Sequence, residues 1–416
     1  MHTDAKRHLL LGSGARIELG SFASVLIGLA LILSCIVYRE PAPVDVLLMM
    51  AVFAVPMLGA GVVRAGTLFH LCLWLIVAAC GLLGVSFSVT FDTAIQHQLV
   101  TLYLALSSFT LSCYIAQSPH DRAMLVFWCY TVGAVLAAIA TIIGYFHLVP
   151  GAYELFTRYG RGQGTFKDPN VLGGAMAPAL LFCAWMLLRG KGAEVKFAVL
   201  AAVPIAMALL LSFSRGAWGS TIFSAVLMAG VAWMRTRRRR DNVRMTIVLA
   251  LGGGILAAGL VTALQFEAVQ TLITERANLE QDYDQGPEGR FGGQRKAIGL
   301  ILNNPLGIGT HTFRTIHHPE EAHNVYLSTF LNAGWLGGLA YVAAVLLTLG
   351  VAFRASLRMS SLQGPLLVAT AAFAGLAFEG LIVDTDHWRT FFIVQAIIWG
   401  LIDAPTVPGA QMPVVA

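Results

Sequence analysis

Cationic and imidazole side chains stand at several boundaries between long apolar runs of this sequence. Arg215 lies in a connection of a few residues, Arg290 in a long polar segment, and His323 where that segment meets the next apolar run. Guanidinium groups bind phosphate oxygens in bidentate fashion, and a neutral imidazole can accept a proton near pH 7. These residue types could hold an anionic leaving group and take a proton from a hydroxyl.

A second polar segment, residues 149–169, supplies further candidates. It contains Arg161 and Lys167 and is followed directly by Asn170. A single cation at a membrane boundary often only extends toward the lipid headgroups. Several such cations, in loops that converge on one face of a helical bundle, indicate a binding site instead.

Histidines and carboxylates are concentrated before a late apolar run. Thirteen residues include His311, His317, His318, Glu320, Glu321 and His323. Such side chains can ligate a metal, but their spacing matches no helix with zinc ligands at positions i and i+4. We therefore expect no metal site and no cofactor. His323 is interpreted separately, either as an interfacial hydrogen-bonding residue or as a functional base.

The composition excludes an ordinary soluble enzyme. Of the 416 residues, 57% are hydrophobic and 12% are charged, whereas soluble domains carry about 25% charged residues. The 27 Lys and Arg outnumber the 22 Asp and Glu, but they form short clusters between apolar runs. This pattern indicates membrane topology and not nucleic-acid binding. All six cysteines lie in apolar runs, so we expect neither disulfides nor a thiolate metal site.

The apolar runs predict membrane spans, because a bilayer core needs about 20 apolar residues as a helix. We expect an all-α polytopic membrane protein with about twelve spans. The runs cover residues 20–38, 43–63, 67–89, 98–116, 123–148, 170–188, 197–213, 217–234, 245–264, 324–352, 363–383 and 388–403.

Lys and Arg in the short connections predict that both termini are cytoplasmic. Residues 1–264 would then hold the first nine spans and residues 265–322 one large periplasmic loop. Residues 323–403 would hold the last three spans, and residues 404–416 a cytoplasmic tail.

The predicted large loop should contain short helices. Apolar spacing predicts an amphipathic helix over 266–282, and a second helix is expected from Arg295 to Leu302. The glycine-rich residues 286–293 would join the two. Such an arrangement suits either a lid over a site or an ordered cap without motion.

Four motifs, in this order, resemble the bacterial O-antigen ligase and polysaccharide polymerase superfamily. They are Gly162-Gln-Gly-Thr-Phe166 to Pro169-Asn170, Ser212-Phe-Ser-Arg215-Gly-Ala, Gly289-Arg290 with Asn304-Pro-Leu-Gly-Ile-Gly309, and His323-Asn-Val-Tyr-Leu327 with Gly334-Trp-Leu-Gly337. The sequence departs from the family at Arg295-Lys296, where members often carry an aromatic residue.

The resemblance implies a glycosyltransferase of GT-C-like architecture in the bacterial inner membrane. It implies an undecaprenyl-diphosphate-linked glycan as donor, a periplasmic site surrounded by membrane lipids, and a metal-independent reaction that inverts the anomeric carbon. A ligase transfers the glycan to the lipid A core, whereas a polymerase transfers it to the next repeat unit. We expect the ligase and keep the O-antigen or exopolysaccharide polymerase as the alternative.

The same resemblance assigns roles to individual residues. Arg215 and Arg290 match the family's arginines that hold the donor diphosphate, and His323 matches its proposed base. We expect further substrate-binding residues to be Arg161, Lys167, Asn170, Asn324 and Tyr326.

A transporter or flippase is the competing class. Transporters built from two similar halves have repeats or a long central connection, and neither is apparent here. A flippase would need charged residues inside the bundle, but the runs are nearly free of them apart from Glu379. The polar residues 384–389 either serve the acceptor side of a site or only separate two helices.

Overall fold

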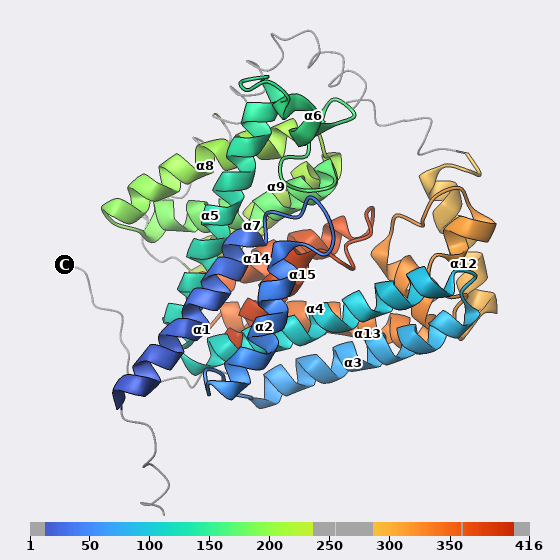
Figure 1. The fold of residues 1–416 in the computed structure, drawn as a ribbon, viewed down its shortest axis with the longest axis horizontal. Helices are drawn as coiled ribbons and strands as arrows, with labels where there is room; N and C mark the ends of the chain where they lie inside the picture. Colours follow the sequence, from blue (N-terminus) through green and yellow to red (C-terminus); the bar gives the residue numbers. More distant parts are fainter. Residues whose placement is uncertain (1–12, 236–253, 255–285, 359–360, 403–416) are drawn as a thin grey trace, which may run out of the picture.

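The computed structural model describes residues 13–235, 254, 286–358 and 361–402. These residues are mainly helical (Figure 1). The elements are α1 (Ser13–Leu33), α2 (Pro43–Met57), α3 (Ala65–Gly84), η1 (Val85–Phe87), α4 (Phe91–Gln117), α5 (Pro119–Tyr145), α6 (Ala152–Phe156), β1 (Thr157–Arg158), β2 (Arg161–Gly162), α7 (Pro169–Arg189), α8 (Ala193–Leu211), α9 (Arg215–Arg235), α12 (Arg290–Asn303), η2 (Phe313–His317), α13 (Val325–Ser356), α14 (Gln363–Glu379) and α15 (Arg389–Ile402).

Wherever the chain is described, each predicted apolar run overlaps a helix. The run 245–264, apart from Gly254, and the predicted helix 266–282 lie outside the described residues. Within the described part, seven helices are long and apolar enough to cross a membrane, and three shorter helices are also apolar. The chain is therefore a polytopic helical membrane protein, and the count of twelve spans stays a prediction.

Two groups of helices form the bundle. α3, α4 and α13 run side by side, and α15 packs against α4 (Figure 1). α7, α8 and α9 lie beside α5 and α14. Every residue of α15 from Arg389 to Leu401 is buried, so this helix lies inside the bundle.

Aromatic side chains fill the centre of this bundle. The Trp74 ring packs against Phe391, Phe392 and Tyr341, with ring centroids 4.7 to 6.4 Å apart. The Trp74 Nε1 donates a hydrogen bond of 3.0 Å to Oε1 of Gln395. The indole is therefore buried with its polar atom satisfied.

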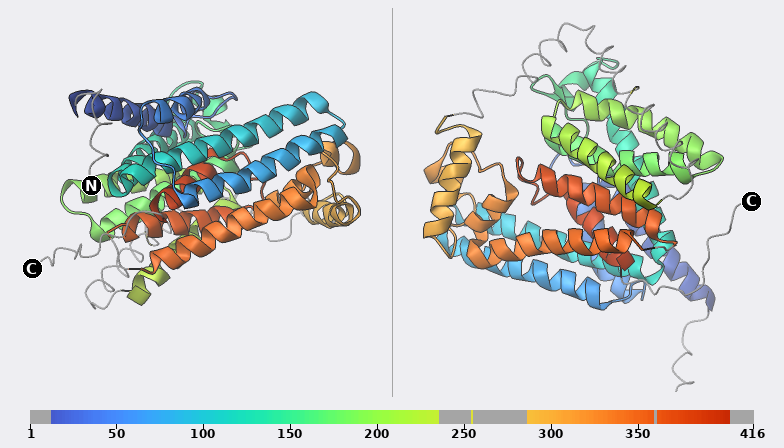
Figure 2. Two further views of the ribbon diagram at one scale, coloured as in Figure 1. Left: turned by 90° about the horizontal axis from the view of Figure 1, so that it is seen from below. Right: turned by 180° about the vertical axis from the view of Figure 1, so that it is seen from behind.

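α12 and the segment after it lie across the ends of α3, α4 and α13 (Figure 2). The loop that follows α12 is fixed to α13 by backbone hydrogen bonds, from Ile308 N to Leu331 O at 2.8 Å and from Trp335 N to Pro305 O at 2.8 Å. At Gly334, φ is +67° and an added Cβ would lie 2.6 Å from the Pro305 carbonyl oxygen. Only glycine suits this approach, so two of the sequence motifs meet here.

α12 begins earlier than predicted. It starts at Arg290 and not at Arg295, and it includes Gly292 and Gly293 in its first turn. A Cβ at Gly292 would lie 2.3 Å from the carbonyl oxygen of Gly286, and one at Gly293 would lie 3.0 Å from the His318 ring. The prediction of a joint through residue 293 was therefore wrong, because these glycines permit close packing within a helix.

Candidate functional site

The connection between α14 and α15, residues 380–388, reaches toward α12 (Figure 1). It also contacts the start of α9. A Cβ at Gly216 would lie 3.0 Å from Cδ1 of Ile382. In the next turn of α9, Ser220 Oγ donates a 3.0 Å hydrogen bond to Oε2 of Glu379. Arg215, the first residue of α9, therefore lies at the same end of the bundle as this connection.

Two further segments meet the same connection. Gln294 Nε2 in the first turns of α12 donates to the carbonyl oxygen of Leu381 at 3.5 Å. Val325 N at the start of α13 donates to the carbonyl oxygen of Gly380 at 2.9 Å. The segments that carry Arg215, Arg290 and His323 thus surround residues 379–384. The three residues predicted to carry the chemistry belong to one rim of the bundle.

The imidazole of His323 lies between two carboxylates. Its Nε2 is 3.2 Å from Oε2 of Glu320, and its Nδ1 is 3.9 Å from Oδ2 of Asp384. The side chain is 34% exposed, so solvent or a substrate can reach it. Ser328 Oγ donates a 2.6 Å hydrogen bond to Asp384 and fixes that carboxyl group. Burial, together with the charge of Asp386, raises the pKa of Asp384 to about 7.

Arg161 and Asn170, two of the predicted substrate-binding residues, contact each other. A short antiparallel pairing of β1 with β2 holds Arg161, which is buried. Its Nη2 donates to Oδ1 of Asn170 at 2.8 Å, and its Nε donates to the carbonyl oxygen of Ser212 at 2.8 Å. Because Ser212 precedes Arg215 by three residues, the hydrogen bond from Arg161 stabilises the turn that carries Arg215.

Lys167 forms an ion pair that the sequence did not predict. Its Nζ is 3.0 Å from Oε2 of Glu40. Oε1 of Glu40 lies 3.3 Å from Nη1 of Arg389. Burial alone would raise the pKa of Glu40, but Lys167 and Arg389 outweigh it and lower that pKa. The polar loop before α7 is therefore joined electrostatically to the start of α15.

A buried ion pair extends this network. Arg389 donates from Nε and Nη2 to the two carboxylate oxygens of Asp45, each at 2.7 Å. Tyr103 also donates to Asp45, at 3.1 Å. The expectation that the predicted runs carry almost no charge apart from Glu379 was wrong here, because Asp45 lies within the run 43–63. The charge is tolerated since it has an opposite charge and hydrogen-bond donors around it.

Two predicted substrate-binding residues have structural contacts. The Asn324 side chain accepts hydrogen bonds from the backbone N–H groups of Tyr326 and Leu327 and caps α13. The Tyr326 hydroxyl donates to the carbonyl oxygen of Ala377 at 2.8 Å. Asn324 thereby fixes the backbone directly after His323, while Tyr326 joins α13 to α14.

A second polar cluster lies on α4 and on the same connection. Nε2 of His97 is 3.1 Å from Oδ2 of Asp386, and the rings of His97 and His387 are 4.0 Å apart. The sequence suggested a possible role for residues 384–389 but offered no signal for His97. Burial, with a contribution from His97, lowers the pKa of His387 to about 3, so this imidazole is neutral at pH 7. The His311 ring lies 5.2 Å from that of His97.

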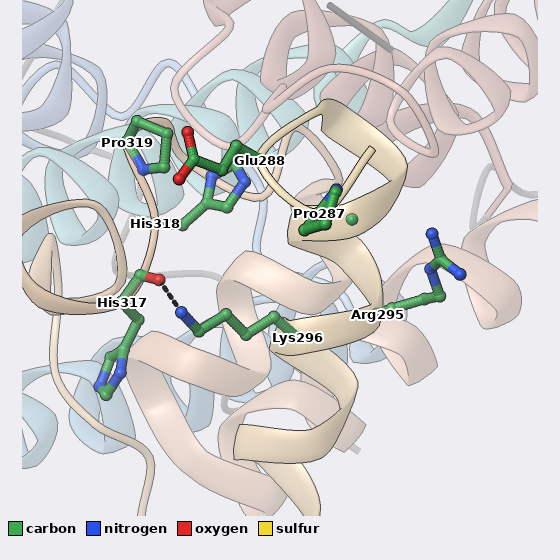
Figure 3. A pocket seen from close by; sticks show the side chains of 8 residues that line it. Pro287, Glu288, Arg295, Lys296, His317, His318 and Pro319 are labelled. Carbon is green, nitrogen blue, oxygen red and sulfur yellow. Dashed lines mark hydrogen bonds between the residues drawn. The ribbon is translucent and has the colours of Figure 1, made fainter. Parts of the chain in front are cut away.

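A pocket of about 470 Å³ lies beside α12. Figure 3 shows Lys296 extending toward the carbonyl oxygen of His317, to which it donates a hydrogen bond, while Arg295 points away from it. The lining residues are Pro287, Glu288, Gly292, Arg295, Lys296, His317, His318 and Pro319. This lining includes none of the three residues predicted to be catalytic.

Residues 197–342 match the family model described as O-antigen ligase. This segment of the chain is similar to that family. The match confirms the resemblance seen in the sequence, and the matched segment contains Arg215, Arg290 and His323. Arg161, Lys167 and Asn170 precede it. No curated protein matches the chain. This similarity supports a function of the ligase or polymerase type in general.

Proposed function

We propose that the protein is an inner-membrane glycosyltransferase that moves a glycan from an undecaprenyl-diphosphate carrier to an acceptor on the periplasmic side. The acceptor that we propose first is the lipid A core, which makes the protein an O-antigen ligase. The observation that carries the proposal is the meeting of three distant segments, with Arg215, Arg290 and His323, around residues 379–384.

The reaction is a single displacement. The acceptor hydroxyl oxygen attacks the anomeric carbon while the bond from that carbon to the diphosphate oxygen breaks, and the bonding pair leaves with the diphosphate. Arg215 and Arg290 stabilise the negative charge that grows on the leaving group, and fixed cations in a site of low dielectric suit this role. One displacement inverts the anomeric configuration.

His323 takes the hydroxyl proton in this scheme. Glu320 accepts a hydrogen bond from Nε2–H at 3.2 Å, whereas Asp384, at 3.9 Å, is too far from Nδ1 to hydrogen-bond to it, so the Nδ1 lone pair takes the proton. Carboxylates in these positions orient an imidazole and stabilise the imidazolium that forms when it accepts a proton. Asn324 supports the same geometry because it caps α13 next to His323.

The test of the catalytic residues uses purified full-length protein, a lipid-linked glycan and lipid A core, with no energy source. We expect His323→Ala to lower transfer by about 10²- to 10⁴-fold, and Arg215→Ala and Arg290→Ala by about 10²- to 10³-fold. Arg354→Ala is the matched control, since Arg354 is exposed near the other end of α13. Full transfer by the His323 variant would remove it as the base.

A polymerase is the second candidate, because the superfamily includes both activities and they differ only in acceptor. A deletion strain separates them. Full-length lipid-linked polymer together with bare lipid A core indicates a ligase, whereas single repeat units indicate a polymerase. A transporter would give no transfer in the purified system. Absence of transfer by the wild-type protein would therefore contradict both assignments.

A further inference from the structure

The cluster of His97, Asp386 and His387 lies outside the group of residues assigned to the donor diphosphate. His97 is in the second turn of α4, and the other two residues immediately precede Trp388 and α15. All three side chains are partly buried. Two elements far apart in the sequence therefore place two imidazoles and one carboxylate together at the rim of the bundle.

The spacing of these donors suits a metal ion. One ligand atom from each residue lies within 4.8 Å of the other two, and His97 Nε2 and Asp386 Oδ2 are 3.1 Å apart. Zinc bonds of about 2.0 to 2.2 Å in a tetrahedral site place the ligand atoms about 3.4 Å from one another. One pair of ligand atoms is slightly closer than this value and every pair lies within 4.8 Å, so rotation of the side chains can bring the three atoms to it.

A neighbouring hydroxyl orients one of the imidazoles. Thr101 Oγ1 lies 3.0 Å from Nε2 of His387 and 3.3 Å from the carbonyl oxygen of His97. If the hydroxyl donates to that carbonyl oxygen, it accepts from Nε2–H of His387 and leaves the Nδ1 lone pair for a ligand. Metal-binding histidines are commonly held in this way, with the second ring nitrogen donating to a polar partner.

We propose that His97, Asp386 and His387 form a binding site for a divalent transition-metal ion of the zinc class. Two imidazoles and one carboxylate favour Zn²⁺ over Mg²⁺ and Ca²⁺, which prefer oxygen ligands alone. Three protein ligands leave one position of a tetrahedral ion open. A further imidazole, that of His311, lies against the His97 ring and contacts Glu321 at 3.1 Å.

The ion would join α4 to the connection that contacts the proposed catalytic segments. Asp386 is two residues from Asp384, which lies beside His323. A bound metal would therefore hold this connection against α4. The inference is independent of the proposed glycosyl transfer, because it assigns the metal a role in binding and stability, and the donor diphosphate keeps its arginine ligands.

The experiment uses full-length protein in detergent, purified with a tag that contains no histidine and treated with a chelator. Co²⁺ is titrated and followed by its visible absorption, and then Zn²⁺ or an excess of Mg²⁺ is added. We expect one Co²⁺ bound per chain, displacement by Zn²⁺ and none by Mg²⁺. Zn²⁺ should also raise the thermal midpoint, because a ligand that binds only the folded state stabilises it.

Three variants and one matched control test the assignment. His97→Gln, Asp386→Asn and His387→Gln should each weaken Co²⁺ binding at least about tenfold. His120→Gln should bind normally, since the exposed pair of His120 and Asp121, 3.2 Å apart, has no third ligand among the described residues. Size-exclusion elution profiles establish that the variants fold. His97 lies on α4, whereas Asp386 and His387 lie in the connection before α15, so the variants test both sides of the site.

A hydrogen-bonded cluster without a metal is the rival explanation. In that case wild-type protein would bind no stoichiometric Co²⁺, and Zn²⁺ would leave the thermal midpoint unchanged. Either result overturns the proposal, as does wild-type affinity in folded Asp386→Asn and His387→Gln variants.

Discussion

The ion pair between Arg389 and Asp45 gives the sharpest prediction about stability. The guanidinium makes two contacts of 2.7 Å with the carboxylate, and the side chains of Arg389 and Asp45 are only 8% and 15% exposed. Removing one partner of a buried pair costs about 3 to 5 kcal/mol, because the other charge stays buried and uncompensated. Asp45 keeps donors from Ala42 N and Tyr103, so we expect about 3 kcal/mol for Arg389→Met.

The double variant Arg389→Met with Asp45→Asn should recover much of this loss. Neutral side chains of similar size leave no unpaired charge, and replacing a whole buried pair is often nearly neutral. Lys167→Met is the control, since the pair of Lys167 and Glu40 is exposed and such pairs contribute about 0 to 1 kcal/mol.

The assay is denaturant unfolding of the purified protein in detergent, followed by tryptophan fluorescence. A double-mutant cycle gives the coupling free energy directly. A loss of unfolding free energy below about 1 kcal/mol for Arg389→Met would refute the reasoning. So would a loss in the double variant equal to the sum of the losses in Arg389→Met and Asp45→Asn. The first result would mean that solvent compensates the carboxylate, and the second that the residues do not interact.

Four further outcomes follow from the same geometry. Asp384→Asn should lower the turnover number of transfer while leaving the donor KM nearly unchanged, because Asp384 contacts His323 at 3.9 Å; steady-state kinetics in the purified system measure both. Arg161→Lys should reduce transfer, since an ammonium on a shorter side chain cannot reproduce both hydrogen bonds, to Ser212 and Asn170; Lys191→Arg, at an exposed position, is the control. The stabilisation from Glu40 should be present above the ordinary pKa of a glutamate and lost as pH falls through its lowered folded-state value; acid unfolding of wild type against Glu40→Gln tests this, and equal acid sensitivity would contradict it. Gly334→Ala should destabilise the protein by roughly 1 to 3 kcal/mol, because φ there is +67° and the Pro305 carbonyl oxygen is 2.6 Å from the new Cβ; unfolding midpoints should show no such loss for Gly350→Ala, which has open space around it.

The helices were predictable because the apolar composition of a run is enough to place that segment in the bilayer. A stretch of about 20 apolar residues needs no information from elsewhere in the chain to become a membrane helix. The candidate residues were also visible, since Arg215 and His323 border such runs and Arg290 lies in the long polar segment between two of them. Gly292 and Gly293 of α12 were predicted to be part of a joint, whereas they allow close packing. A sequence does not distinguish a glycine that makes the backbone flexible from one that leaves room for a close neighbour.

The sequence by itself determined that the chain enters the membrane repeatedly and which polar side chains stand at the ends of its helices. Only the tertiary structure decided which of these side chains meet. Arg389 and Asp45 are 344 positions apart, and His97 reaches Asp386 only because α4 packs beside α15. Hydropathy fixes the depth of a residue in the bilayer, but contacts between distant helices depend on how their surfaces interlock, and no single run of residues records that.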